Sequence, residues 1–451
     1  MDLKDKKVLV VGTGISGIGA AALLCNQGAD VILYDENEKV SEGEVAKKLP
    51  EGVTPEIITG KLTEQKKNSV NLVVISPGVP IDSPIVEEYK TMGVPVWGEI
   101  ELAYNYEQGK VAAITGTNGK TTTTALVGEI VAAYADKCFV VGNIGNPYTL
   151  EVSKTDKESY TVAEISSFQL ETIHNFKPVV SAILNITPDH LNRHKTMECY
   201  IKTKENIAVN QTKKEVCVLN YDDEVLREYG KECPASVVFF SRKETLEQGA
   251  YMIGKDIMYS DGMTQEKILS VDEMQLIGAH NYENVMAAIA ITKALGISTE
   301  IIRKTIMSFK AVEHRIEYVA TKNDVIYYND SKGTKSDASI TAIEAMTRPT
   351  ILIGGGYDKK TEFDDFIKSF GSTVKKLVLI GATREKIAAT AEKYGFKNYV
   401  FADSLEEAVN ICYKSAVPGD AVLLSPACAS WDMFEGYEQR GRLFKEYVNN
   451  L

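Results

Sequence analysis

The chain has 451 residues, of which 44% are hydrophobic and 25% are charged, so its composition is that of an ordinary globular protein and excludes disordered and fibrous classes. Its formal net charge of −12 excludes the broad basic field that nucleic acids and anionic membranes require. At roughly 100 to 200 residues per domain, this length predicts about three domains.

The cysteines and the amino-terminal segment bear on where the protein works. The seven cysteines are scattered and never spaced C-x-x-C, which predicts reduced thiols and a cytoplasmic protein. The uncharged run from Val8 to Ala29 is superficially similar to a signal peptide or a membrane span. Because it is rich in glycine and follows the acidic residues Asp2 and Asp5, we expect neither export nor a membrane span.

The first 35 residues predict a strand, a glycine turn, a helix and a second strand. Gly12, Gly14 and Gly17 fit G-x-G-x-x-G between the strand and the helix, and Asp35 closes the next strand. This pattern indicates a nucleotide site, and taken alone it favours an NAD-dependent oxidoreductase. A glycine turn needed only for packing is the alternative. The strand and helix units of this region end near residue 98.

The segment AAITGTNGKTTTTALV, residues 112 to 127, lies between a predicted strand and a predicted helix. Its glycine loop is shorter than the standard Walker A loop, but its backbone N–H groups and the helix start can still hold phosphates. Lys120 is then placed to reach the γ-phosphate, and the Thr121 hydroxyl to bind Mg²⁺. The residues that we expect at ATP here are Gly116, Thr117, Asn118, Gly119, Lys120, Thr121 and Thr122.

A triphosphate site of this kind needs an acid at a neighbouring strand end to complete the metal site. Glu164 ends one predicted strand, and Asp189 and His190 end another, at the sheet edge where ligands bind. Mg²⁺ prefers oxygen, so Glu164 is the expected ligand. The structural alternatives are a helix cap for Asp189 and a helix N-terminal position without metal for His190.

Motifs along nearly the whole chain, taken in order, resemble the Mur ligase family. They are TGTNGKTTT, GNIG at 142–145, EISSFQLE at 164–171, NITPDHLNRH at 185–194, GAHNYENVMAA at 278–288, EHRIE at 313–317, NDSKGT at 329–334 and SPACASWDMF at 425–434. The resemblance implies an ATP-dependent amide ligase that adds D-glutamate to UDP-N-acetylmuramoyl-L-alanine through an acyl phosphate, in peptidoglycan precursor synthesis. Another Mur ligase, a folylpolyglutamate synthase and a non-catalytic nucleotide-binding scaffold are the other hypotheses.

The resemblance also implies an α/β fold of three domains. We expect a Rossmann-like domain over residues 1–98 that holds the UDP-sugar, a central P-loop mononucleotide-binding domain over 99–311, and a Rossmann-like domain over 312–451 for the amino acid and ATP. The last domain shows its own strand-and-helix rhythm, in DVIYYNDS, PTILIGGG, KKLVLIGA, NYVFAD and DAVLLSPACAS. We expect a monomer whose last domain closes on ATP about a hinge at Phe309 to Arg315.

The remaining site residues come from the family's motifs. The resemblance implies two Mg²⁺ ions held by Thr121, Glu164, His190 and a carbamylated Lys204, with Asn143 also around these ions and Lys202 as the alternative lysine. The implied catalytic set is Lys120, Asp189, His190 and Lys204. Further nucleotide contacts are Asn281, Asn284, His314, Arg315 and Asp330, with Asn281 also a candidate helix cap. The UDP-sugar set is Ser16, Asp35, Ser76, Gly78 and Asn143, and the D-glutamate set is Lys332, Thr334, Lys359, Ser430 and Tyr437.

Overall fold

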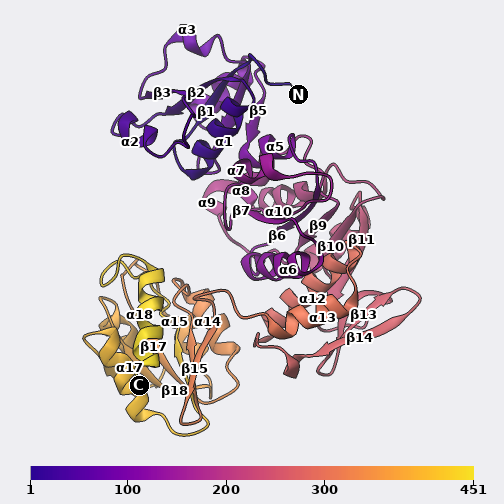
Figure 1. Cartoon of the computed structure of the whole chain (residues 1–451). Coiled ribbons are helices and arrows are strands. Elements are labelled where there is room, and N and C mark those ends of the chain that lie inside the picture. Colours follow the sequence, from indigo (N-terminus) through magenta and orange to yellow (C-terminus); the bar gives the residue numbers. More distant parts are fainter. Residues whose placement is uncertain (1) are drawn as a thin grey trace. The chain divides into compact units, whose positions relative to one another are not determined.

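The computed structural model describes residues 2–451 and contains three β-sheets, which Figure 1 colours from indigo through magenta and orange to yellow. Contacts group the chain into two compact units. The first unit comprises the residues up to Val271 together with Glu283–Ile306, and the second comprises Asp272–Tyr282 and Met307–Leu451.

The first sheet is parallel throughout, with strand order β3-β2-β1-β4-β5. Its central strands are short apolar runs buried on both faces, as expected where helices cover a parallel sheet. A Cβ at Gly17 would lie 1.8 Å from the Gly12 carbonyl oxygen, so the predicted glycine turn is needed for close packing. The elements are β1 Lys7–Val11, α1 Ile15–Asn26, β2 Asp30–Asp35, α2 Glu42–Ala46, β3 Glu56–Thr59, α3 Glu64–Lys67, β4 Leu72–Ile75, α4 Pro84–Thr91 and β5 Val96–Gly98.

The central sheet has nine strands in the order β14-β13-β12-β11-β10-β9-β6-β8-β7, and only the pairs β12–β13 and β13–β14 are antiparallel. Strand β6 therefore lies between β8 and β9. Its strands are β6 Lys110–Thr115, β7 Cys138–Gly142, β8 Tyr160–Glu164, β9 Val180–Ile183, β10 Val216–Asn220, β11 Ser236–Ser241, β12 Gln248–Ile253, β13 Asp256–Asp261 and β14 Gln265–Ser270. The helices of this region are α5 Glu99–Tyr104, α6 Lys120–Tyr134, α7 Tyr148–Glu151, α8 Ser167–Leu170, α9 Leu191–His194, α10 Met197–Glu205, α11 Glu224–Glu232, α12 Ala279–Ala294 and α13 Thr299–Ser308.

One hydrophobic cluster runs through both sheets of the first unit, from Leu3 to Ala235. Helices α5 and α7 meet in the region where these two sheets pack together. There the buried Glu99 carboxylate of α5 accepts hydrogen bonds from the backbone N–H and the hydroxyl of Thr149 in α7, at 2.7 and 2.9 Å. Burial raises the pKa of Glu99, and these donors oppose the rise. The first two sheets are therefore packed together through a shared core.

The third sheet has the order β15-β16-β20-β17-β18-β19 and is parallel except for the edge strand β15. Successive residues of β17 face opposite cores, because Ile351 and Ile353 belong to one cluster and Leu352 to another. The elements are β15 Glu317–Lys322, β16 Val325–Asn329, α14 Ser336–Glu344, β17 Thr350–Gly354, α15 Asp364–Lys368, β18 Val374–Leu379, α16 Arg384–Lys393, β19 Tyr399–Phe401, α17 Leu405–Ser415, β20 Ala421–Leu424 and α18 Tyr437–Asn449.

The predicted three-domain α/β architecture is confirmed, while the domain bounds stay predictions. The predicted strand rhythm of the last domain corresponds to β16–β20, and the edge strand β15 is an addition that the sequence pattern did not indicate. The uncharged run at Val8 to Ala29 forms β1 and α1. Within residues 2–451, no helix combines the length and apolar character that a bilayer crossing needs.

Candidate active site

The phosphate loop between β6 and α6 depends on two glycines in conformations that side chains rarely adopt. Gly116 has φ 151° and Gly119 has φ 85°. A Cβ at Gly119 would lie 2.2 Å from the Oδ1 of Asn284. Helix α6 begins at Lys120, directly after the loop, so the predicted strand, loop and helix are confirmed.

Two lysines converge on one carbonyl of this loop. Lys120 donates from Nζ to the carbonyls of Gly116 at 2.8 Å and Thr117 at 2.9 Å, and Lys204 donates to Gly116 at 2.8 Å. Lys204, on α10, is only 1% exposed. Burial, with the nearby Lys120 charge, lowers the pKa of Lys204 to about 7. An appreciable fraction of this amine is therefore neutral near pH 7.

Glu164 ends β8 and pairs in register with Ile114 of β6, two residues before the phosphate loop. Its side chain is buried, and its Oε1 accepts from the Nδ2 of Asn143 at 2.7 Å. Its Oε2 has no hydrogen-bond partner among the described residues. A buried carboxylate oxygen without a partner is costly, so this position suits a cation.

The loop after β9 is fastened to the phosphate loop. Thr117 donates its backbone N–H to the Asn185 carbonyl at 2.9 Å, and Asn118 donates to Asn185 Oδ1 at 2.8 Å. The amide of Thr187 donates to the hydroxyl of Thr117 at 3.0 Å. Asn185, which the sequence reasoning did not assign to the site, therefore holds the two loops in register.

Asp189 and His190 differ in place from the prediction. Strand β9 ends at Ile183, so both residues lie in the loop beyond the strand and not at its end. The residue that caps α9 is His190, with a left-handed φ of 52°, so the alternative of an Asp189 cap is wrong. Asp189 accepts from the His190 backbone N–H at 2.9 Å, and the two side chains approach to 3.4 Å. The chain turns left-handed here, which delays the helix by one residue.

The predicted UDP-sugar residues of the first sheet gather at the carboxyl ends of neighbouring strands β2, β1 and β4. Asp35 accepts from the hydroxyl of Thr13 at 2.6 Å. The Ser76 hydroxyl is buried without a hydrogen-bond partner among the described residues, while Ser16 is half-buried and Gly78 is exposed. Asn143 lies apart from this group, on Glu164 of the central sheet.

Two of the predicted nucleotide residues of the second unit lie next to the first strands of the third sheet. Arg315 comes before β15 and is partly buried, and Asp330 comes directly after β16 and is buried. Burial raises the pKa of Asp330 to about 7, although the hydroxyl of Ser425 at 2.6 Å and the Arg315 charge oppose the rise. The Nε of Arg315 is buried without a hydrogen-bond partner among residues 2–451. Both Asp330 oxygens accept hydrogen bonds, from the Ser425 hydroxyl and the Ile316 backbone N–H, so among the described residues only the Nε of Arg315 is left without a partner in this pair.

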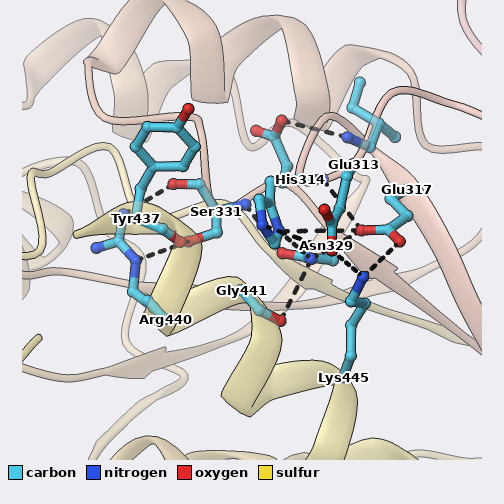
Figure 2. Close-up of polar contacts among 11 residues, drawn as sticks. Glu313, His314, Glu317, Asn329, Ser331, Tyr437, Arg440, Gly441 and Lys445 are labelled. Atoms are coloured by element: carbon cyan, nitrogen blue, oxygen red, sulfur yellow. Dashed lines mark hydrogen bonds and ion pairs between the residues drawn. The ribbon is translucent and has the colours of Figure 1, made fainter. Parts of the chain in front are cut away.

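His314 is buried, and Figure 2 shows its ring beside Asn329. Its Nδ1 lies 2.9 Å from the Nδ2 of Asn329, which can only donate, so this ring nitrogen accepts and the imidazole is neutral. A Cβ at Gly441 of α18 would lie 2.2 Å from the same nitrogen. The ring is buried within its own unit, where it positions the loop ahead of Arg315.

Glu313, His314 and Glu317 are the one set of three His, Cys, Asp or Glu side chains in the described part of the chain whose ligand atoms lie within 4.8 Å of one another. The Lys445 ammonium donates to Glu313 at 2.5 Å and to Glu317 at 2.9 Å. Figure 2 draws these contacts. Asn329 also donates to Glu317 at 3.0 Å. An ammonium and an amide already satisfy these carboxylates, so the cluster is a structural network.

The predicted D-glutamate residues fall into two groups. Thr334 and Lys359 line one cavity of about 400 Å³, and Lys359 Nζ also lies 4.6 Å from the ring centre of the exposed Trp431. Ser430 is buried beside Trp431 in the chain. Lys332 Nζ lies 5.5 Å from the ring centre of Tyr437.

Asn281 and Asn284 both lie inside α12, which begins at Ala279. Asn281 donates from Nδ2 to the Ile277 carbonyl at 2.8 Å, so the expectation that it caps the start of its helix is wrong. The helix begins two residues earlier, after Gly278 with φ 94°. Asn284 Oδ1 lies 3.4 Å from the hydroxyl of Thr123, which places it at the phosphate loop.

Comparison with known proteins supplies the family. The chain matches the Mur ligase MurD-like N-terminal domain over residues 6–98, the Mur ligase middle domain over 114–292, and the Mur ligase glutamate ligase domain over 314–428. It is 64% identical over 451 residues to the UDP-N-acetylmuramoylalanine-D-glutamate ligase of Lachnospira eligens, covering 100% of both chains. The chain belongs to the Mur ligase family. The ligase of the same name from Lachnoclostridium phytofermentans is 56% identical, over 100% of this chain and 99% of the relative.

Solved Mur ligases share the fold at much lower identity. The UDP-N-acetylmuramate-alanine ligase of Thermotoga maritima is 19% identical with a TM-score of 0.60, covering 99% of each chain. A MurF ligase from the same organism, solved in complex with ADP, is 18% identical with a TM-score of 0.59, covering 99% of this chain and 96% of that one.

Several residues near the site of this Mur ligase were not predicted from its sequence motifs. Asp223, at the start of α11, accepts from the Ile186 backbone N–H at 2.8 Å, and Asn220 donates to the Leu184 carbonyl at 3.1 Å. Arg440 is fully buried and donates to the carbonyls of Ser331 and Cys428, at 2.8 and 3.2 Å. The segment NYDDE at 220–224 predicts a turn and a helix cap. It does not predict that the capping residue, Asp223, also binds the loop after β9.

Proposed function

We propose that this Mur ligase uses ATP to join the amine of D-glutamate to the carboxylate of UDP-N-acetylmuramoyl-L-alanine, in peptidoglycan precursor synthesis. Full-length relatives at 64%, 56% and 49% identity that carry this ligase name support both the reaction and the substrates. The structural observation that carries the proposal is the meeting of Lys120 and Lys204 on the Gly116 carbonyl. The neighbouring strand carries Glu164, whose Oε2 has no hydrogen-bond partner within residues 2–451.

The reaction must overcome the poor electrophilicity of a carboxylate. An oxygen of the acceptor carboxylate attacks the γ-phosphorus of ATP, the bond to the β-phosphate oxygen breaks, and ADP leaves. The resulting acyl phosphate is attacked by the amine, and phosphate leaves as the amide forms. Each step gathers negative charge beside groups that are already anionic, so the site must supply positive charge in a fixed place.

Residues 116–121 are proposed to hold the ATP phosphates. The left-handed Gly116 and Gly119 let the backbone approach the phosphate chain, and the start of α6 adds its aligned N–H groups. In this structure Lys120 donates to carbonyls of its own loop. We expect its ammonium to exchange these carbonyls for phosphate oxygens, which accept more strongly because they are charged.

The site also fits Mg²⁺, which when bound neutralises charge on the transferring phosphoryl group. The oxygen of Glu164 that lacks a partner among the described residues suits this hard cation, and the half-buried hydroxyl of Thr121 is the expected second ligand. His190 and Lys204 complete the proposed set for two ions.

Lys204 is proposed to act as a carbamate. A buried ammonium beside Lys120 is poorly placed to help a cation bind, whereas its carbamate is an anion with two oxygen ligands. Carbamate formation needs the neutral amine as the nucleophile toward CO₂, and the lowered pKa of Lys204 supplies it near neutral pH. The exposed Lys202, paired with Glu205 at 2.8 Å, lacks this environment.

The attacking amine has to lose a proton. We propose Asp189 as the relay, because a His190 that is bound to metal is too committed to serve as the base. Their side chains approach each other to 3.4 Å, and both are partly exposed beside the phosphate loop. In the second unit, Lys359 and Thr334 of the 400 Å³ cavity are proposed to bind the D-glutamate carboxylates, together with Ser430, Lys332 and Tyr437. Arg315, Asp330, Asn281 and Asn284 are proposed to bind the nucleotide.

We also place the protein in the cytoplasm as a monomer. All seven cysteines are free in the structure, which agrees with a reducing compartment. Light scattering of the purified protein tests the monomer directly.

The test of the function is substrate-dependent ADP release. Purified protein is supplied with ATP, Mg²⁺ and UDP-N-acetylmuramoyl-L-alanine, and a panel of amino acids is added singly. We expect ADP and a new amide product with D-glutamate, and little of either with L-glutamate, L-lysine or D-alanine. A product with another amino acid would assign a neighbouring Mur ligase activity. ATP binding without turnover under every condition would indicate a scaffold.

A further inference from the structure

Arg193 lies on α9, three residues beyond His190, and is committed to contacts on two sides. Its side chain is 14% exposed and that of its partner Glu171 is 5% exposed. The guanidinium uses Nε and both terminal nitrogens, so its fork of donors is engaged around its whole edge. No role in the reaction proposed above requires this arrangement.

One side of Arg193 fixes the guanidinium on the central sheet. Its Nε lies 3.1 Å from Glu171 Oε1, and one terminal nitrogen lies 2.5 Å from Oε2, which is a bidentate ion pair. The guanidinium carbon is 4.3 Å from the ring centre of Phe168. The same ring meets His190 edge-on at 4.9 Å between centroids. Arg193 is thus coupled to His190 through Phe168.

The other side of Arg193 reaches the first sheet. Its terminal nitrogens donate to the carbonyls of Pro77 at 3.1 Å and Val79 at 3.0 Å. These carbonyls flank Gly78 in the turn after β4, which the Val79 amide closes on the Ser76 carbonyl at 2.9 Å. One charged side chain therefore joins the turn that carries Ser76 and Gly78 to the loop that carries His190.

We propose that Arg193 is a positioning residue that sets the distance between the UDP-sugar turn, residues 76–79, and the phosphoryl-transfer edge of the central sheet. The inference rests on the proposed function, because it assigns the two sides to the acceptor and to ATP. The acceptor carboxylate has to stand in line with the γ-phosphorus, and a misplacement of about 1 Å can cost roughly 100-fold in rate. Glu171 and Phe168 fix the guanidinium, and the guanidinium fixes the turn.

The first test needs no substrate. Hydrogen exchange is measured on peptides covering residues 76–80 in the wild type, in Arg193→Lys and in Glu171→Gln. Lysine keeps the charge but cannot span Glu171 and both carbonyls, so we expect exchange at the Val79 amide at least about 10-fold faster in Arg193→Lys. Glu171→Gln leaves the carbonyl contacts but loosens the guanidinium, so its effect should be smaller and in the same direction.

The second test separates positioning from stability through steady-state kinetics. For Arg193→Lys we expect kcat/KM for UDP-N-acetylmuramoyl-L-alanine to fall about 100-fold, while KM for D-glutamate changes less than about 2-fold. The matched control is Arg348→Lys in the second unit, because Arg348 also pairs with a carboxylate and a carbonyl of one residue, Asp324. Its kinetics should match those of the wild type.

Two results would overturn the inference. Unchanged exchange at residues 76–80 in Arg193→Lys would show that the arginine does not hold the turn. Equal losses toward both substrates, at a lowered thermal midpoint, would reduce Arg193 to a stabilising contact. A wild-type protein that releases no ADP with these substrates would instead remove the proposed function, and the exchange experiment would still decide whether the turn is held.

Discussion

The central-sheet edge and the network around His314 contain the same kinds of side chain but leave them in opposite states. At the central edge, Glu164 keeps a buried oxygen without a partner among the described residues, and the pKa of Lys204 is lowered to about 7. In the second unit, Lys445 neutralises the carboxylates of Glu313 and Glu317, as Figure 2 shows. Residue type alone therefore does not mark the reactive site. What marks it is a buried polar group whose hydrogen-bonding or charge partners are incomplete.

The largest effect is expected from Lys120, which stands at the start of α6. Lys120→Ala removes the cation proposed to meet the γ-phosphate, so kcat should fall about 1,000-fold. ADP release is the measurement, with circular dichroism to show that the fold persists. The matched control is Lys202→Ala on the exposed face of α10, which should keep kcat within about 2-fold. Similar losses in the two variants would remove the special role of Lys120.

Glu164 and Glu317 offer a direct contrast between the two regions. Glu164→Gln removes the negative charge of the carboxylate whose Oε2 lacks a partner among the described residues. It should lower kcat about 100-fold and raise the Mg²⁺ concentration needed for half-maximal rate. Glu317→Gln weakens the contacts to Lys445 and Asn329 and should cost about 1 kcal/mol of stability with little change in kcat. Mg²⁺ titrations and thermal melts of both variants are compared. Reversed outcomes would mean that the reactive region has been misassigned.

Bicarbonate dependence tests the state of Lys204. Because its pKa is about 7, the neutral amine dominates above pH 7 and becomes scarce below it. After removal of CO₂ at pH 6.5, activity should drop about 10-fold and return slowly when bicarbonate is added. If removal of CO₂ leaves the activity unchanged at every pH, the result would argue against a carbamate on Lys204.

The same pKa gives a stability prediction with a defined sign. The folded pKa of Lys204 lies below the unfolded value near 10.5, so folding releases a proton and the stability of the unmodified protein rises with pH between about 7 and 10.5. Lys204→Met lacks this group. In CO₂-free buffer, the free energy of unfolding of the wild type, measured by denaturant melts, should therefore increase relative to that of the variant as the pH rises over that range. A constant difference across the range would contradict the lowered pKa.

The last prediction concerns the stability of the second unit, at Asp330. Its folded pKa of about 7 lies above the ordinary value of 3.8, so its burial destabilises the unit increasingly as pH rises from about 4 to 7. Asp330→Asn should raise stability by roughly 1 to 3 kcal/mol at pH 8 and by little at pH 4, while weakening ATP binding. Melts at the two pH values check the sign, and an equal gain at both would contradict it.

Local patterns predicted much of this molecule. An apolar run followed by a glycine turn and a helix pattern is enough to place Gly12 and Gly119 at strand-to-helix turns, and Glu164 at the end of a strand. These features depend on residues that are near in sequence, where periodicity and turn chemistry decide the conformation. The same holds for the threonines at the start of α6, of which Thr122, Thr123 and Thr124 are buried.

Contacts between residues that are far apart in the sequence could not be predicted from those local patterns. Nothing local indicates that Arg193 reaches Pro77, 116 residues away. The grouping of Asn143 with Glu164 came from the family resemblance and not from a local pattern. Asp189 was misplaced because an apolar run shows where a strand can form but not where its pairing stops. His190 adopts a left-handed conformation that its neighbours in sequence do not require. Such contacts are set by how the strands pair and how the sheets pack, which only the folded chain reveals.

The most direct measurement of the central claim follows oxygen. UDP-N-acetylmuramoyl-L-alanine is labelled with heavy oxygen in its alanine carboxylate, and the phosphate released in one turnover with ATP and D-glutamate is analysed by mass. Attack of that carboxylate on the γ-phosphorus predicts one labelled oxygen in each phosphate. Phosphate free of label, released together with the amide product, would contradict the acyl phosphate and the arrangement of the site proposed here.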